Sequence, residues 1–203
     1  MRLILFVGIA VIAVVVIAVL AYSLTSGLSS TSAITQNKSA NSTTIYMSPT
    51  QAGLLLNSSL TDYSTSDLFN PASTVNVSLL ESFVPQLAGN ATSGWVTMAI
   101  GTSTSNASLE YIAITTSNTA SIAYLLGSSI ASSVSADMAT AAINSGTYNG
   151  LAYTYDAYQN STATFQTVYG WKNDNVGLTI VQENAGFFAN ETALVDATAN
   201  DTP

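Results

Sequence analysis

The side chains of this sequence that can carry acid–base chemistry are almost all carboxylates. The chain has 203 residues, with 11 Asp and Glu, 3 Lys and Arg, and neither His nor Cys. A glycosidase needs two carboxyl groups roughly 5–9.5 Å apart, one of them with a raised pKa. No spacing pairs the acids that lie on or beside expected strands, which are Glu110, Asp156, Asp174 and Glu183. We therefore predict no catalytic residue and no enzyme activity.

The missing residue types also exclude most metal and nucleophile chemistry. Without Cys and His there is no thiol nucleophile, imidazole base, Cys/His zinc site or usual haem ligand. A serine nucleophile would have to use Lys38 or Lys172 as its base. Residues 173–177 carry alternate oxygen side chains as a calcium loop does, but they lack the closing bidentate Glu, and a hairpin turn favours the same residues. We predict no metal and no cofactor.

The most distinctive cluster is aromatic. Rings on one face of a sheet could stack on sugars, but cross-strand aromatic pairs also stabilise ordinary sheets, and we favour that second interpretation. The residues predicted for ligand stacking are Tyr153, Tyr155, Tyr169 and Trp171, within a set that also holds Tyr148, Tyr158 and Phe165.

Residues 46–203 are expected to form one domain that positions these groups. Apolar residues alternate in the expected strands and recur every three or four residues in the expected helices. Ser48-Pro49 is a good helix start, Asn190 is a helix cap, and 172–175 is a turn. The expected order is helix 48–57, loop 62–72, helix 75–88, strands 95–101 and 109–116 joined by a hairpin loop, helix 118–143, strands around 151–155, 165–171 and 176–180, and helix 190–200.

Strands in hairpin-linked groups with helices between them are typical of an α+β fold. We predict one antiparallel sheet with helices packed on one face. The alternative is a β-sandwich, which applies if residues 118–143 are not helical. Gly127 and the serines after it could also divide that helix into two.

The first residues predict a membrane anchor. Residues 3–21 form an unbroken apolar run, which as a helix is about 28 Å long and close to the ~30 Å hydrocarbon core. Arg2 precedes the run and Lys38 follows it, so the positive-inside rule predicts a cytoplasmic N-terminus and an extracellular C-terminal domain. A cleaved secretory signal, with 19–21 as its cleavage site, is the alternative. The expected divisions are anchor 1–22, tether 23–45 and extracytoplasmic domain 46–203.

The tether and the domain carry many predicted glycan acceptors. Residues 23–44 are rich in Ser and Thr and lack aromatics, as a disordered tether does. Asn-x-Ser/Thr occurs roughly twice as often as random placement of these residue types gives, and each glycan must remain in water. The predicted glycosylation sites are Asn37, Asn41, Asn57, Asn76, Asn90, Asn106, Asn160, Asn190 and Asn200.

The anchor, the tether and these acceptors together resemble membrane-anchored, N-glycosylated surface proteins of archaea, especially acid-living ones. The resemblance is to this class, and it implies a cell-surface location. A formal net charge of −8 excludes a nucleic-acid partner. The expected partners are membrane lipid through residues 3–21 and other surface proteins or glycans.

We predict a non-enzymatic, single-pass surface glycoprotein with an interaction or envelope-structural role. An anchored ligand- or glycan-binding domain is the first alternative. A secreted filament subunit, released by signal cleavage and completing the sheet of its neighbour, is the second.

Overall fold

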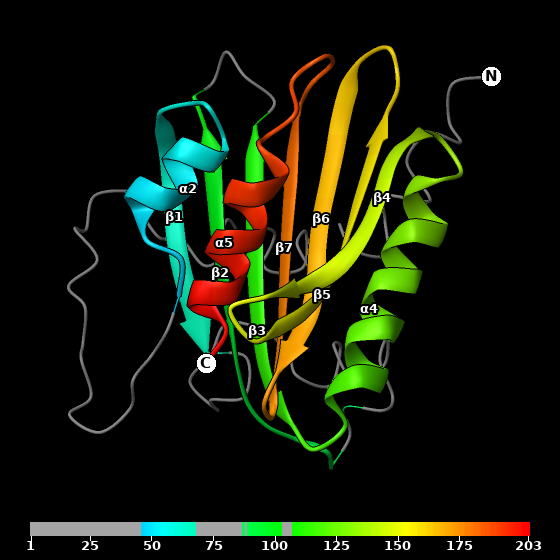
Figure 1. Ribbon diagram of the computed structural model, residues 1–203. Helices are drawn as coiled ribbons and strands as arrows, with labels where there is room; N and C mark the ends of the chain where they lie inside the picture. The colour runs from blue at the N-terminus through cyan, green and yellow to red at the C-terminus, as the bar shows by residue number, and fades with distance from the viewer. Residues whose placement is uncertain (1–45, 68–86, 88, 103–106) are drawn as a thin grey trace.

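The domain is built on one antiparallel sheet. The computed structural model describes residues 46–67, 87, 89–102 and 107–203. In these residues seven strands lie in the order β1-β2-β3-β7-β6-β5-β4 (Figure 1). The strands are β1 (Leu60–Asp67), β2 (Ala91–Gly101), β3 (Ser108–Thr116), β4 (Ala139–Tyr148), β5 (Leu151–Gln159), β6 (Ala163–Lys172) and β7 (Asn175–Asn184), and the helices are α2 (Pro49–Leu55), α4 (Thr119–Val134) and α5 (Glu191–Asp201).

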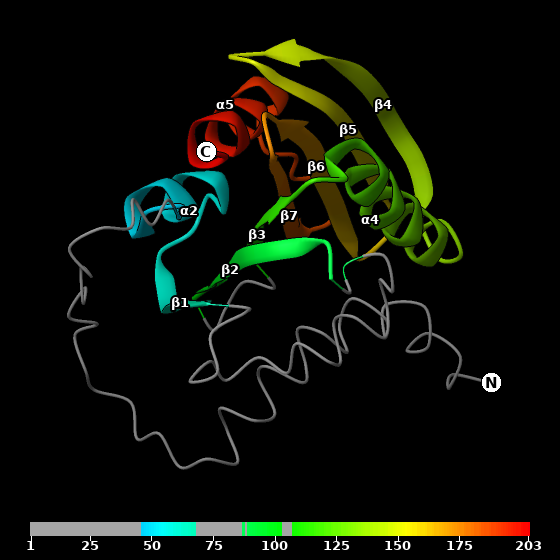
Figure 2. The same cartoon turned by 90° about the horizontal axis from the view of Figure 1, so that it is seen from below.

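Helices cover both faces of the sheet. Figure 2 shows α4 on one side of the twisted sheet and α2 and α5 on the other. Side chains alternate between these two faces, because successive residues of a strand point in opposite directions. In β3, Ile112 and Ile114 pack toward α4, whereas Leu109 and Tyr111 pack toward α2 and α5. The fold therefore has three layers and two apolar cores.

The local sequence explains where the predicted helices α2 and α5 begin. Ser48 accepts a hydrogen bond from the Gln51 N–H, and the Gln51 side chain accepts one in return from the Ser48 N–H. This capping box and Pro49 in the first turn define the start of α2. Asn190 accepts from the Ala193 N–H at 3.2 Å and begins α5. Both predicted helix starts are confirmed.

Two segments differ from the sequence-based expectation. The loop expected at 62–72 is wrong over 62–67, because these residues belong to strand β1, which pairs with β2. The helix expected at 118–143 is half right. It ends at Val134, and a turn through Asp137 leads into strand β4. Gly127 does not break the helix but lies inside it, against the sheet.

The other strand predictions are confirmed. The 95–101 and 109–116 strands pair as β2 and β3, and the last three predicted strands form β5, β6 and β7. One antiparallel sheet with helices packed on it is confirmed, and the β-sandwich alternative is wrong, since all strands of the described ranges belong to a single sheet. The helices occupy two faces and not one, because both faces of the central strands are apolar.

Several predictions lie outside the described residues. These are the anchor at 3–21, the tether at 23–44, the helix at 75–88 apart from Leu87, and the acceptors Asn37, Asn41, Asn76 and Asn106. Within the described part of the chain, no helix combines the length and the apolar character needed to cross a bilayer.

Candidate functional site

The structure keeps the four candidate carboxylates apart. Glu110 and Asp156 share the α4 face and one row across the sheet, with Ile180 and Thr167 between them. Three strand spacings separate their backbones by about 14 Å, beyond glycosidase geometry. Glu183 lies on the opposite face from Glu110 and Asp156, and Asp174 is exposed in the turn between β6 and β7.

Within the described ranges, Glu110 is a buried acid without a cationic neighbour. It is 7% exposed and lies between Met98 of β2 and Ile180 of β7. Burial raises the pKa of its carboxyl to about 8, because an apolar setting disfavours the charged form. The group is therefore expected to be neutral in the folded protein near pH 7.

A second buried acid belongs to a polar cluster under α4. Asp156 is 3% exposed and lies near the Tyr169 phenol. Burial raises the pKa of Asp156, and the nearby Tyr169 phenol partly opposes the rise. The buried Thr167 hydroxyl on the adjacent strand has no hydrogen-bond partner. The cluster can hold a proton, but it offers no second carboxyl for acid–base catalysis.

The candidate calcium loop is used for internal contacts. The Asn175 side chain accepts from Thr115 at 2.7 Å and donates to the Pro203 carbonyl at 3.2 Å. The Lys172 ammonium donates to the Ala199 and Thr202 carbonyls at the end of α5. In the ranges that the structure describes, no three acidic residues gather as a metal site would require.

The four predicted stacking rings do not share a surface. Tyr153 and Tyr155 point to the α5 face, whereas Tyr169 and Trp171 point to the α4 face, as the β5–β6 register shows. Tyr155 is buried and accepts a hydrogen bond from Gln166 at 2.8 Å. Tyr155 therefore serves the core, and the four rings together form no flat platform.

Tyr153 instead joins a group that the sequence did not reveal. Two exposed hydrogen bonds connect β4 to α5: the Asn144 amide donates to Glu191 at 2.8 Å, and the Tyr148 hydroxyl donates to Asp196 at 3.0 Å. The Asp196 carboxylate raises the pKa of Tyr148 by this bond and by its charge. We call Asn144, Tyr148, Tyr153, Glu191 and Asp196 the β4–α5 surface.

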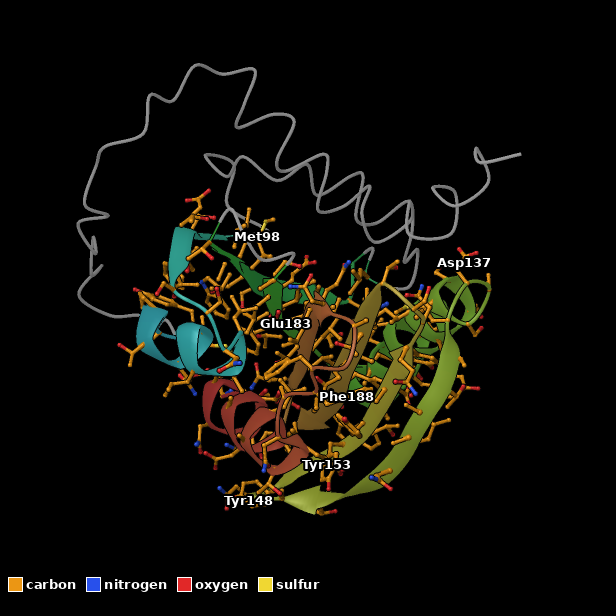
Figure 3. The ribbon with its side chains drawn as sticks, turned by 90° about the horizontal axis from the view of Figure 1, so that it is seen from above. Met98, Asp137, Tyr148, Tyr153, Glu183 and Phe188 are labelled. Carbon is orange, nitrogen blue, oxygen red and sulfur yellow. The ribbon has the colours of Figure 1, made fainter. Side chains whose placement is uncertain are left out.

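The position of Tyr153 completes the β4–α5 surface. Its ring lies over Gly146 of the neighbouring strand, where a Cβ would come within 3.3 Å of the ring. Figure 3 shows Tyr148 and Tyr153 at the same end of the molecule, beside α5. Rings, amide and carboxylates thus lie together on one exposed part of the domain.

The outer edge of β4 is unpaired within the described chain. All but one of its ten residues are exposed, and β4 is the last strand of the sheet. Asn149 and Gly150, with φ of 46° and 83°, form the tight turn to β5. Because Tyr148 and Leu151 close this two-residue loop, ladder bonds to β5 recur at every second residue.

The same alternation fixes which groups face outward. Gly146 and Asn144 bond to β5, whereas Ile143, Ser145 and Thr147 direct their N–H and C=O groups to the free edge. Ile143 is 61% exposed. The edge is therefore a row of exposed backbone groups without a partner strand in the described chain, beside an exposed apolar side chain.

The described glycan acceptors all lie at the ends of elements. Asn57, Asn190 and Asn200 are exposed, and Asn90 and Asn160 are half-buried in turns. The Asn160 side chain accepts from the Thr162 and Ala163 N–H groups and donates to the Asp137 carbonyl at 3.4 Å. These positions are compatible with the predicted glycosylation, which remains a prediction.

We expect Asn160 to carry less glycan than Asn190 when sugar is transferred to the folded domain. A sugar on the Asn160 amide nitrogen displaces its bond to Asp137, and a loss of about 1 kcal/mol corresponds to roughly fivefold lower occupancy. Glycopeptide mass spectrometry measures both sites in one digest. Equal occupancy would show that the internal bonds of Asn160 do not limit modification.

Sequence spacing could not reveal the β4–α5 surface. Asn144 and Glu191 are 47 residues apart, and Tyr148 and Asp196 are 48 apart. The one available signal was Asn149-Gly150, a typical hairpin turn that marks the end of β4.

Compared with known proteins, the chain matches no protein-family model and no curated protein.

Proposed function

We propose that the chain is a non-enzymatic, single-pass surface glycoprotein whose extracytoplasmic domain has an interaction or envelope-structural role. The observation that carries the interaction role is the exposed edge of β4, which is unpaired among the residues that the structure describes. An uncovered strand edge is a template for pairing with another chain, and proteins usually blunt or cover such edges. The apolar run at 3–21 supports the anchor.

Two further observations support an exposed, acidic setting. The five described acceptors lie at element ends, where a glycan can remain in water. Burial raises the pKa values of Glu110, Asp156, Glu183 and Asp201. Neutral buried carboxyls favour a fold that works in acid, as the resemblance to surface proteins of acid-living archaea implies.

The test is mass spectrometry of the protein from its native membrane, together with protease treatment of intact cells. We expect an N-terminus at residue 1, glycan on several acceptors, and cleavage of the domain from outside. An N-terminus near Tyr22 would favour the secreted filament subunit. A cytosolic, protease-resistant and unmodified protein would contradict the proposal.

A second candidate function is glycan binding, which the β4–α5 surface favours. Its two tyrosines offer ring faces, and Asn144, Glu191 and Asp196 offer hydrogen-bonding groups of the kind that hold sugar hydroxyls. Titration with a panel of neutral hexose oligosaccharides tests this function. Tyr148→Ala should weaken binding about tenfold, whereas Tyr124→Ala, at a 69% exposed ring on α4, should not. Equal effects would contradict a site at this surface.

A further inference from the structure

Among the described residues, nothing gives the edge of β4 the usual protection against pairing. Residues 139–148 contain no charged residue and no proline, and the strand has full length. Native edges are typically short, carry Lys or Pro, or are covered. The one irregularity is a register shift between Thr140 and Ala142, which leaves 142–148 regular. This regular part is available for a partner strand.

We propose that β4 pairs edge to edge with β4 of a second copy of this chain, antiparallel and about a twofold axis at Ser145. The inference rests on the proposed interaction role and names its partner. The result is one continuous sheet that runs through both copies. Each outward N–H and C=O of Ile143, Ser145 and Thr147 then meets its counterpart on the other copy.

The side chains suit this register on both faces of the sheet. On the α4 face, Ile143 lies opposite Thr147 of the second copy, so that the exposed apolar side chain gains a neighbour. On the α5 face, Asn144 lies opposite Gly146 of the second copy, beside the Tyr153 ring that lies over this glycine. No like charges oppose each other in the paired segment.

The charges near the edge argue against a cationic partner strand. Asp156 of β5 lies opposite Ile143 and is buried on the α4 face. Glu191 and Asp196 each accept a hydrogen bond from a β4 side chain. These carboxylates are therefore held over the α5 face, and the edge itself is neutral. A neutral, self-complementary edge fits a second copy better than a partner chosen by charge.

The pairing is expected to be weak in dilute solution. A ten-residue strand is about 33 Å long, and pairing along one edge buries less than the ~800 Å² per partner of a standard interface. The net charge of −8 on each copy opposes association at low salt. Attachment to one membrane raises the effective concentration and favours the pair.

Cysteine cross-linking of the full chain in mild detergent tests the register, since the natural sequence has no Cys. Ser145 on one copy lies about 5.5 Å from Ser145 on the other, Cα to Cα, which a disulfide can bridge. Ser145→Cys should give at least about tenfold more cross-linked dimer than Thr140→Cys, whose two copies lie about 30 Å apart. Ile143→Cys and Thr147→Cys should cross-link when mixed and not when alone.

A second measurement does not depend on new disulfides. Ile143→Lys places a charge at the exposed edge and should raise the dimer dissociation constant at least about tenfold in analytical ultracentrifugation. Leu54→Lys, at a 78% exposed residue of α2, is the matched control and should leave it unchanged.

A monomer at all concentrations, or a dimer that cross-links through Thr140→Cys and not Ser145→Cys, would overturn the inference. Both outcomes leave the surface location untouched. Conversely, a cytosolic location would contradict the proposed function without changing the cross-linking result.

Discussion

The free energy of unfolding of this protein is expected to fall by several kcal/mol as the pH rises from about 4 to 8. The cause is a set of buried carboxyls whose pKa values are raised, of which Glu110 has the largest value, about 8. Lys172 is the one basic residue in the described ranges, and it binds main-chain carbonyls at the end of α5. The fold is therefore more stable when these buried carboxyls are protonated than when they are ionised.

The direction follows from the two states of Glu110. In the unfolded chain it ionises near its ordinary pKa of 4.5, whereas in the fold it keeps its proton to about pH 8. Between these values only unfolding releases the proton, and each pH unit favours the unfolded state by about 1.4 kcal/mol. The contribution of Glu110 is fully present below pH 4.5, and about 5 kcal/mol is lost by pH 8.

Asp201 acts in the same direction over a lower range. Burial, with a smaller contribution from the charge of Asp196, raises its pKa from 3.8 to about 6. One of its carboxylate oxygens is buried without a hydrogen-bond partner. Stability from this group is present below pH 3.8 and is lost as the pH rises through 6.

Urea unfolding of the full chain between pH 3 and 8.5 measures this profile. Glu110→Gln should flatten it, leaving stability at pH 4 nearly unchanged and raising it by several kcal/mol at pH 8. Asp174→Asn, at an exposed acid in a turn, is the matched control and should keep the natural slope. A maximum near pH 7 with loss of stability in acid would contradict the prediction.

Replacing Gly127 by alanine is expected to destabilise the domain by about 2–3 kcal/mol, or roughly 5–10 °C in Tm. Gly127 lies in the middle of α4, where Ala would ordinarily strengthen the helix. Here a Cβ would overlap ring carbons of Tyr169 on β6. The ring cannot withdraw freely, because Tyr169 is partly buried and packs against the apolar core under α4.

Thermal unfolding can separate this clash from a general effect of alanine. Gly53→Ala, in α2, is the control, because its nearest neighbour would be the Ser58 carbonyl at an ordinary 3.5 Å. It should be neutral or stabilising. Tyr169→Leu should reduce the penalty of Gly127→Ala, which a double-mutant cycle reports as coupling between the two residues. Additive effects would show that the ring is not the cause.

The sequence predicted most elements whose buried faces are strongly apolar. Alternation identified β2, β3, β5, β6 and β7, and capping residues identified α2 and α5. Strand β1 was missed because Leu60 and Tyr63 are its main apolar residues, and two such residues do not make an alternating pattern. Its place is set instead by pairing with β2, as in the 3.0 Å contact between the Thr65 and Thr97 hydroxyls. The residues of β2 that fix the position of β1 lie in another part of the chain, so the sequence of β1 alone does not predict it.

Strand β4 was missed for the opposite reason. Met138 and Ala142 continue the four-residue spacing of α4, and alanine favours helices. The strand forms because β5 offers a complete backbone edge and Asn149-Gly150 turns the chain back onto it. The β4–α5 surface depends on this strand, so an error in one element also concealed the candidate site.

The strand order also has a consequence for how the chain folds. Strands β4 to β7 follow one another as hairpins, and β1 to β3 form a second group, but the two groups meet only where β3 pairs with β7. Ser108 pairs with Gln182, so a long loop must close before the groups join, at a cost in chain entropy. The sheet cannot be completed until residues 175–184 have emerged during synthesis, and the β3–β7 junction should set the folding rate.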